Sequence, residues 1–203
     1  LQYHAAGFRE ADADIIAICD MNEAAAAKAA KEYDVANVFS DVAEMLERQP
    51  DLEAVSVITP NRFHKPLSVQ LLEAGKHVFC EKPPVTNNNE LEKLRNLSIQ
   101  NKQRIFFNFN LRFSELNERF KQIKNSDDIG KIIFVNIIIA HGFAFKDKYK
   151  NSWRSDSEKN LHNILETLAI HYIDLLKWNF GEIDRYSYFP TLNSKIGSSY
   201  DTS

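Results

Sequence analysis

GKHVFCEKPPVT, residues 75–86, is the stretch that decides how the rest of the chain is interpreted. Gly75 is suited to end a helix, and HVFC (77–80) is a short apolar run typical of a buried strand. Glu81 and Lys82 then follow directly, before two prolines stop the run. Prolines are also common in ordinary surface turns. The lysine is therefore a candidate functional residue only if the strand belongs to a sheet that binds a ligand at this end.

Short apolar runs alternate with helical patterns through the first half of the chain. Strands are predicted at 14–19, 53–58, 77–80 and 104–109, and helices at 22–33, 41–47, 64–75 and from near residue 86. Asn22 and Asp41 are suited to cap the first two of these helices, and Asp41 and Glu44 have the spacing of a capping box. Strands that are buried on both faces and alternate with helices predict a parallel, doubly wound α/β sheet.

Polar residues follow three of these predicted strands. They are Asp20, then Thr59, Pro60 and Asn61, and then Glu81 and Lys82. Ligands of doubly wound sheets bind outside the carboxyl ends of the strands, so these residues are expected to lie at one binding edge. Asp20 is placed to accept hydrogen bonds from an adenosine ribose and to repel a 2′-phosphate, which favours NAD over NADP. The alternative for Asp20 is that it only begins a turn.

The chain has the composition of a soluble globular protein, with 203 residues, 44% hydrophobic and 26% charged. A net charge of −3 gives no reason to expect nucleic acid or an anionic membrane as partner. No apolar run reaches the roughly 18 residues of a membrane span, and no signal peptide is recognised. The two cysteines, Cys19 and Cys80, lack metal-ligand spacing. We therefore expect no metal site and a cytoplasmic location.

Both ends of the sequence look cut. Leu1 enters what already resembles a helix, and the glycine-rich phosphate loop that should precede Asp20 would lie before it. The last residues, GSSYDTS (197–203), are polar and close no element. We therefore expect a fragment of a longer protein.

Several motifs together resemble the glucose–fructose oxidoreductase, inositol dehydrogenase and MocA family. They are TPNRFH (59–64), AGKHVFCEKP (74–83), NFNLRFSE (108–115), GKI (130–132), SWR (152–154) and IHYIDLLKW (170–178). The resemblance implies a dinucleotide-binding Rossmann domain over residues 1–108. It also implies a C-terminal α/β domain with a largely antiparallel open sheet over residues 109–203. The apolar run KIIFVNIIIAHG (131–142) is expected to be a strand of that sheet, covered on both faces, and homo-oligomerisation through the sheet is expected.

The resemblance also implies roles for individual residues. Those on the cofactor side are Thr59, Pro60, Asn61, His64, Glu81, Lys82, Trp153 and Arg154. Lys82 would hold the substrate hydroxyl and stabilise the oxygen on which charge develops, and His171 would accept the proton. His64 equally suits the first turn of the following helix. Asn110 and Arg112 would contact either the substrate or the neighbouring domain.

The family pattern is broken just before His171. Leu161, His162 and Asn163 occupy positions where glycines are common, and Ala169 replaces another glycine. Thr167 stands where an aspartate is common, four residues before His171. Glu166 is adjacent but is rotated by about 100° on an α-helix. A threonine can hold a hydroxyl but cannot raise the basicity of a histidine as a carboxylate does.

The residues and the resemblance together predict an NAD-dependent dehydrogenase. Its substrate would be a sugar, polyol or nucleotide-sugar, oxidised or reduced at a hydroxyl carbon. The alternative is a non-catalytic sugar sensor of the same fold, which binds dinucleotide and regulates a protein partner. The replaced aspartate favours the sensor, whereas the retained Lys82 and His171 favour the enzyme. A third hypothesis is that the chain is a fragment that only binds nucleotide.

Overall fold

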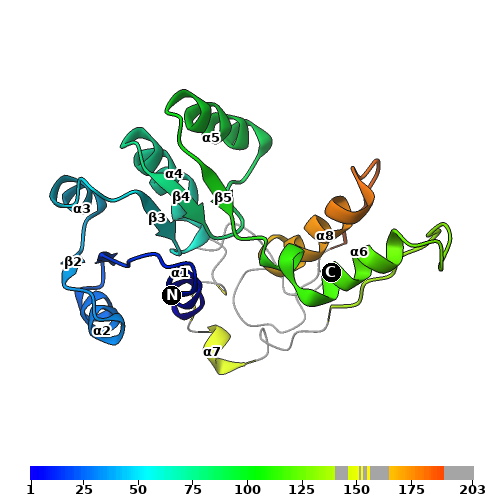
Figure 1. Ribbon diagram of the computed structural model, residues 1–203, viewed down its shortest axis with the longest axis horizontal. Helices are drawn as coiled ribbons and strands as arrows, with labels where there is room; N and C mark the ends of the chain where they lie inside the picture. Colours follow the sequence, from blue (N-terminus) through cyan, green and yellow to red (C-terminus); the bar gives the residue numbers. More distant parts are fainter. Residues whose placement is uncertain (140–145, 151, 153–154, 156–164, 190–203) are drawn as a thin grey trace. The chain divides into compact units, whose positions relative to one another are not determined.

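The computed structural model describes residues 1–139, 146–150, 152, 155 and 165–189 (Figure 1). The chain forms two compact units. The first consists of residues 1–58, 66–79 and 93–106, and the second of residues 59–65, 80–92 and 107–203. None of the helices in the described ranges combines the length and the apolar character needed to cross a bilayer.

Helices and strands alternate from the first residues to position 107. The helices are α1 (Gln2–Glu10), α2 (Glu23–Tyr33), α3 (Val42–Arg48), α4 (His64–Glu73) and α5 (Asn88–Gln100). The strands are β1 (Ala17–Cys19), β2 (Asn37–Phe39), β3 (Ala54–Val57), β4 (His77–Cys80) and β5 (Ile105–Phe107). A short 3₁₀ helix, η1 (Asn61–Phe63), precedes α4. The predicted βα alternation is therefore confirmed, with β2 as a strand that the sequence patterns did not reveal.

The strands form two parallel sheets, one of order β1-β2 and one of order β3-β4-β5. In the first sheet Ala17 pairs with Asn37 and Cys19 with Phe39. In the second, the N–H of Val78 donates to the carbonyl of Arg104 at 2.9 Å, and that of Asn108 donates to Cys80 at 2.8 Å. Residue numbers rise together along both strands, so β4 and β5 are parallel. These orders match strands 3-2 and 4-5-6 of the doubly wound Rossmann sheet.

Local signals explain where these helices begin and end. The side chain of Asn22 accepts the Ala25 N–H at 3.1 Å, and that of Asp41 accepts the Glu44 N–H at 3.0 Å. Both predicted N-caps are therefore confirmed. After α4, Gly75 adopts a φ of 72°. This left-handed conformation lets the N–H of Lys76 bond back to Leu71, as in a Schellman motif.

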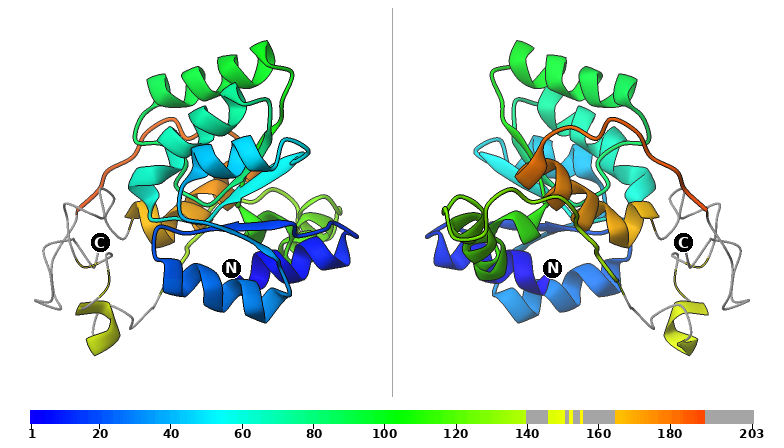
Figure 2. Two further views of the ribbon diagram at one scale, coloured as in Figure 1. Left: turned by 90° about the vertical axis from the view of Figure 1, so that its left-hand side faces the viewer. Right: turned by 90° about the vertical axis from the view of Figure 1, so that its right-hand side faces the viewer.

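Apolar side chains from helices and strands close the core of the first unit. Ile18 of β1 is buried with Ala26, Ala30 and Val35, against which Ile15, Ala29 and Tyr33 pack. Leu71 and Leu72 of α4 are at most 1% exposed, and each contributes about 1.5–3 kcal/mol by burial. Helices α4 and α5 lie side by side in Figures 1 and 2, and Asn101 donates to the Leu72 carbonyl at 3.0 Å.

The second unit continues into short helices. They are the 3₁₀ helix η2 (Asn110–Phe113), α6 (Glu115–Lys124), α7 (Asp147–Lys150), the π-helical turn η5 (Leu165–Ala169) and α8 (Ile170–Phe180). Helix α8 covers residues 170–180, and the wider π turn η5 lies directly before it. On this helix Trp178 is 46% exposed.

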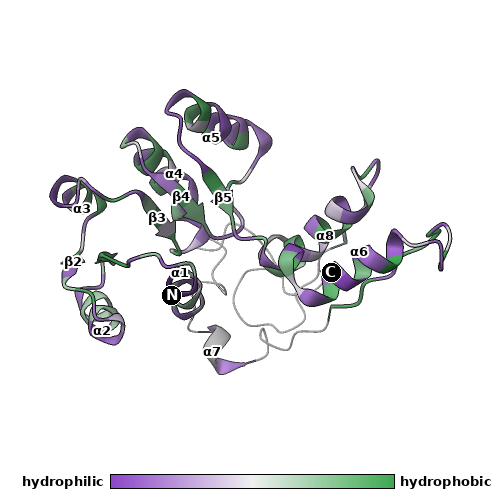
Figure 3. Cartoon of the chain, viewed as in Figure 1, coloured by the Kyte–Doolittle hydropathy of each residue, from purple (hydrophilic) through white to green (hydrophobic). Residues whose placement is uncertain are grey.

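The strand predicted at 131–142 is wrong over residues 131–139, where the backbone is irregular. Residues 140–142 lie outside the described ranges. Figure 3 colours much of this segment as hydrophobic, yet Ile133 is 91% exposed and Phe134 79% exposed. A strand requires a neighbour that takes its N–H and C=O groups. Neither sheet of the described chain offers one, and the antiparallel sheet implied by the resemblance is not found within the described ranges.

Candidate functional site

The loop after β4 holds Lys82 between fixed neighbours. The carboxylate of Glu81 accepts one hydrogen bond from the side chain of Asn108 at 2.7 Å and one from the N–H of Lys82 at 3.2 Å. Asn108 follows β5, so Glu81 links the ends of two adjacent strands. The Lys82–Pro83 peptide bond is cis. Glu81 therefore fixes the backbone from which the lysine side chain extends.

The ammonium group of Lys82 donates a hydrogen bond to the main-chain carbonyl of Thr167. Thr167 lies in the π turn η5, and His171 follows in the first turn of α8. Lys82, Thr167 and His171 therefore lie together in the second unit. Thr167 accepts this hydrogen bond through its main-chain carbonyl. A π turn also changes the i, i+4 relation that an α-helix would give Thr167 and His171.

His171 is half-buried in a field of opposing charges. Burial lowers its pKa first, and the nearby positive charge of Lys82 lowers it further. Glu81 and Asp174 act in the opposite direction and raise that pKa. The ring of Phe109 meets the imidazole edge-on at 6.3 Å. Nδ1 of His171 is buried without a hydrogen-bond partner among the described residues. The histidine is therefore neutral near pH 7, and its buried Nδ1 has no hydrogen-bond partner within the described ranges.

An ion pair that the sequence analysis missed lies one helical turn beyond His171. Arg112 donates through two guanidinium nitrogens to both carboxylate oxygens of Asp174, with the Nε–Oδ2 distance at 2.7 Å. The guanidinium also lies over the rings of Trp178, at 4.4 Å, and Phe109, at 5.3 Å. The hydrogen bonds that Arg112 donates to Asp174 raise the pKa of Arg112. The sequence did contain one signal for Asp174. It lies three residues after His171 in HYID, a spacing that places both side chains on the same face of a helix.

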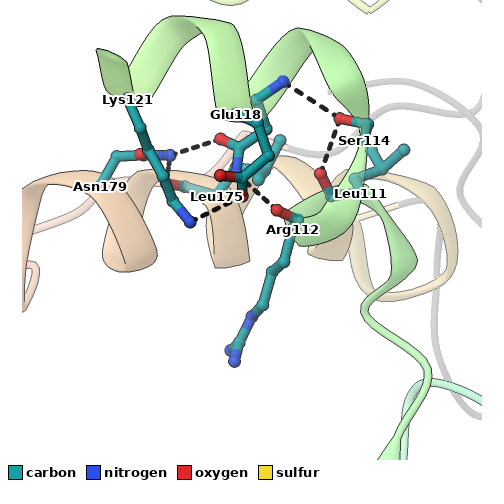
Figure 4. Close-up of polar contacts among 8 residues, drawn as sticks. Leu111, Arg112, Ser114, Glu118, Lys121, Leu175 and Asn179 are labelled. Atoms are coloured by element: carbon teal, nitrogen blue, oxygen red, sulfur yellow. Dashed lines mark hydrogen bonds and ion pairs between the residues drawn. The ribbon is translucent and has the colours of Figure 1, made fainter.

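The backbone of Arg112 is tied to α8 by a chain of amides (Figure 4). The side chain of Asn117, which is 5% exposed, donates to the Arg112 carbonyl at 2.7 Å. Asn179 of α8 in turn donates to Asn117 and to the Leu175 carbonyl, both at 2.9 Å. The Arg112 side chain extends away from this network in Figure 4. Arg112 is therefore held at both its ends, and Asn110 beside it is exposed.

The residues after β3 form a second group. Pro60 caps η1, Asn61 is 5% exposed, and the Thr59 hydroxyl is buried without a hydrogen-bond partner in the described part of the chain. His64 is 2% exposed. Its Nε2 lies 2.9 Å from the Thr59 carbonyl oxygen, and its Nδ1 lies 2.7 Å from that of Pro83. His64 thus contacts backbone on both sides, and these contacts link the TPN segment to the Lys82 loop.

The segment that follows the Lys82 loop is held by Glu90 of α5, which bonds both Lys65 of α4 and Thr86. Lys65 bonds Glu90 at 2.8 Å, and Thr86 donates to Glu90 through its N–H at 2.9 Å and its hydroxyl at 2.7 Å. The hydrogen bond from Lys65, followed by those from Thr86, lowers the pKa of Glu90 to about 2. The carboxylate is therefore ionised at neutral pH and anchors the segment that leads from Pro84 into α5.

Asp20 belongs to the first unit and is exposed directly after β1. Its Oδ1 accepts the Asn22 N–H at 2.9 Å, so it does begin a turn. Burial raises the pKa of the adjacent Cys19 thiol, and the charges of Asp41, Asp20 and Glu44 raise it further. The carboxyl end of β1 is therefore electronegative, which disfavours a 2′-phosphate there. Trp153 and Arg154 lie outside the described residues, as does the side chain of Glu166.

Parallel sheets of this order, with polar residues after β1, β3 and β4, define a Rossmann-type nucleotide-binding fold. The sequence profile of the oxidoreductase family with an NAD-binding Rossmann fold (GFO_IDH_MocA) matches residues 1–109. The profile of the GFO/IDH/MocA C-terminal domain matches residues 118–197. The chain belongs to the GFO/IDH/MocA oxidoreductase family.

Similar proteins include characterised dehydrogenases. Levoglucosan dehydrogenase of Pseudarthrobacter phenanthrenivorans is 26% identical over 81% of this chain and 42% of its own length. Inositol 2-dehydrogenase of Salmonella typhimurium is 27% identical over 90% of this chain and 52% of its own length. The WlbA dehydrogenase of Bordetella pertussis, solved with NADH and UDP-GlcNAcA, shares the fold with a TM-score of 0.79 at 24% identity. It covers 97% of this chain, which spans 59% of that structure. The chain thus spans about half the length of these relatives.

Proposed function

We propose that the protein is an NAD-dependent oxidoreductase that transfers hydride between the nicotinamide and a hydroxyl carbon of a sugar, polyol or nucleotide-sugar. The observation that carries this proposal is the placement of Lys82 against the turn that leads into His171. Oxidation of an alcohol requires a base that accepts the hydroxyl proton and a donor that stabilises the developing charge on the oxygen. Neutral His171 and cationic Lys82 can supply these two groups. Support comes from the family and from the named activities of the similar dehydrogenases.

The residues present fit a dinucleotide. The electronegative end of β1 suits an adenosine ribose without a 2′-phosphate. The buried Thr59 hydroxyl has no hydrogen-bond partner among the described residues, so it can bond to the cofactor. NAD, when bound, supplies the acceptor for the hydride. On the cofactor side we place Asp20, Thr59 and Asn61. We also propose that Trp153 and Arg154 of the SWR motif contact the cofactor.

The chain's own residues then have distinct tasks. Neutral His171 accepts the proton of the substrate hydroxyl at its available ring nitrogen, because burial and Lys82 keep its pKa low. Lys82 donates a hydrogen bond to the substrate oxygen as negative charge develops there. Thr167 holds the lysine through its carbonyl in the resting state, and Glu81 fixes the lysine backbone. Arg112 positions Asp174 beside the histidine, and Asn110 remains a proposed substrate contact.

Further features of the whole protein are part of this proposal. We place the boundary between the cofactor domain and the substrate domain at residues 108 and 109. Both cysteines are free thiols, which supports a cytoplasmic protein. Self-association is proposed for the second domain. The sensor of the same fold remains the competing function, and no observation in the structure favours it.

The test is NAD reduction by the purified protein across a panel of sugars, polyols and nucleotide-sugars. We expect turnover with at least one compound and a loss of about 10²–10³-fold in Lys82→Met. NAD binding, measured by thermal shift, should persist in that variant. Lys76→Met is the matched control, because the Lys76 side chain donates to a main-chain carbonyl, that of Pro50, in the first unit. NAD binding without turnover on any compound would identify a sensor, and full activity of Lys82→Met would refute the mechanism.

A further inference from the structure

His64, the first residue of α4, has an unusual pair of contacts for a buried histidine. Its side chain is enclosed, with the residue 2% exposed. Nδ1 lies 2.7 Å from the carbonyl oxygen of Pro83, and Nε2 lies 2.9 Å from that of Thr59. Both distances are those of strong hydrogen bonds. Both partners are main-chain carbonyl oxygens, which can only accept.

The protonation state follows from counting donors. A neutral imidazole carries one N–H and one nitrogen lone pair, whereas the imidazolium carries two N–H groups. In either neutral tautomer, one ring lone pair of His64 would face a carbonyl lone pair at hydrogen-bond distance. Only the cation donates to both oxygens, and charge-assisted bonds of this kind are shorter and stronger than neutral ones.

We propose that His64 is a buried imidazolium that clamps the Thr59 segment to the Lys82–Pro83 loop and so acts as a positioning residue for Lys82. The importance of Lys82 rests on the proposed function, but the charge of His64 does not. Burying a cation is costly unless its hydrogen bonds are satisfied, and the two carbonyls satisfy both. The clamp joins the segment proposed to hold the cofactor to the residue proposed to contact the substrate.

The charges around His64 are compatible with a cation. The loop on its Nδ1 side carries Glu81 and Lys82, of opposite sign, and the segment on its Nε2 side, Thr59–Pro60, is uncharged. On its own element, Lys65 is paired with Glu90 at 2.8 Å. Arg62 points to solvent and lies over the Phe63 ring at 4.5 Å.

The same chain contains a histidine with the opposite geometry. Nδ1 of His77 accepts the backbone N–H of Arg104 at 2.9 Å, so that nitrogen must carry a lone pair. His77 is therefore a neutral imidazole by the same counting. The two histidines form a matched pair, in which one is required to be charged and the other neutral.

The first measurement is the nitrogen NMR spectrum of the purified protein with ¹⁵N-labelled histidine at neutral pH. The His64 resonances are assigned by their loss in His64→Gln, and the His77 resonances by their loss in His77→Gln. We expect two protonated-type nitrogens for His64, and one protonated and one lone-pair nitrogen for His77. A lone-pair nitrogen in His64 would overturn the proposal, whether or not any substrate is found.

The second measurement tests positioning. A glutamine at position 64 can donate a hydrogen bond to one of the two carbonyls through its NH2 group. Its amide oxygen would then face the other carbonyl, and that hydrogen bond would be lost. For His64→Gln we expect kcat to fall by about 10²-fold, with KM for NAD nearly unchanged, whereas His77→Gln should keep kcat. An unchanged kcat in a folded His64→Gln protein would refute the positioning role. If that variant does not fold, His64→Asn is assayed by the same criteria, and the spectrum of the unmodified protein still decides the charge.

Discussion

At the residue scale, Asp20 is the side chain that we propose selects NAD over NADP at the end of β1. Its Oδ1 is used to begin α2 by accepting the Asn22 N–H, and its charge acts together with Asp41 and Glu44 on Cys19. Asp20 therefore has a structural role in the turn beside the specificity role proposed for it. An asparagine can keep the turn hydrogen bond while removing the charge.

We therefore predict that the protein binds NAD at least tenfold more tightly than NADP, about 1.4 kcal/mol, and that Asp20→Asn narrows this ratio. The physical reason is the loss of repulsion toward the 2′-phosphate. Titrations of both dinucleotides measure the ratio, and Asp14→Asn, in the exposed segment before β1, is the control. An unmodified protein that prefers NADP tenfold would contradict the assignment of Asp20.

At the scale of elements, α8 carries a histidine and an acid that the 3₁₀ helix η2 holds in place. Asp174 raises the pKa of His171, while burial and Lys82 lower it. Arg112 neutralises part of the aspartate charge through its two hydrogen bonds. The carboxylate that supports the histidine thus follows it in the sequence, whereas Thr167 occupies the preceding position where the family resemblance implies an aspartate.

Asp174→Asn should lower the pKa of His171 further, because the variant removes a negative charge and leaves Arg112 without its partner. Neutral histidine is the active form of a base, so the acidic limb of the kcat/KM profile should move to lower pH. Loss of the paired carboxylate should also cost about 1–3 kcal/mol of stability.

Profiles of kcat/KM against pH, with chemical denaturation for stability, provide the measurement. Glu118→Gln is the control, since Glu118 pairs with Lys121 on the surface of α6. A limb that moves to higher pH in Asp174→Asn would show that another carboxylate supports the histidine.

At the scale of the whole molecule, the apolar segment 131–139 is the feature that a monomer leaves unexplained. Ile133 is 91% exposed, Phe134 79% and Ile138 84%. Exposed apolar residues in succession mark interaction surfaces more often than single ones do. We propose that a second copy of the protein covers these exposed apolar side chains.

Sedimentation velocity should therefore show a homo-oligomer, and Ile133→Asp should shift it toward the monomer by placing a charge in the contact. Leu116→Asp on α6 is the matched control, because Leu116 is 82% exposed but isolated from that segment in the sequence. A monomeric unmodified protein, or equal shifts in both variants, would reject this surface as the contact.

Much of the first unit follows from the sequence alone. Asn22 and Asp41 cap their helices as predicted, Gly75 ends α4 with a positive φ, and β4 occupies the predicted residues 77–80. These signals are local, because a cap or a strand run acts within a few residues of itself. Strand-end placement marked Lys82 as a candidate, and the family resemblance marked His171, since the motifs around both are contiguous in the chain.

The tertiary structure alone decided which distant groups meet. Lys82 reaches the Thr167 carbonyl across 85 positions, Arg112 reaches Asp174 across 62, and His64 reaches Pro83 across 19. Periodicity cannot reveal such pairs, because it describes the faces of one element and not the path that brings two elements together. For the same reason β2, a strand of three residues, is recognisable only through its pairing with β1. The sequence by itself determined the elements and the candidate residues, and the fold decided what each candidate touches.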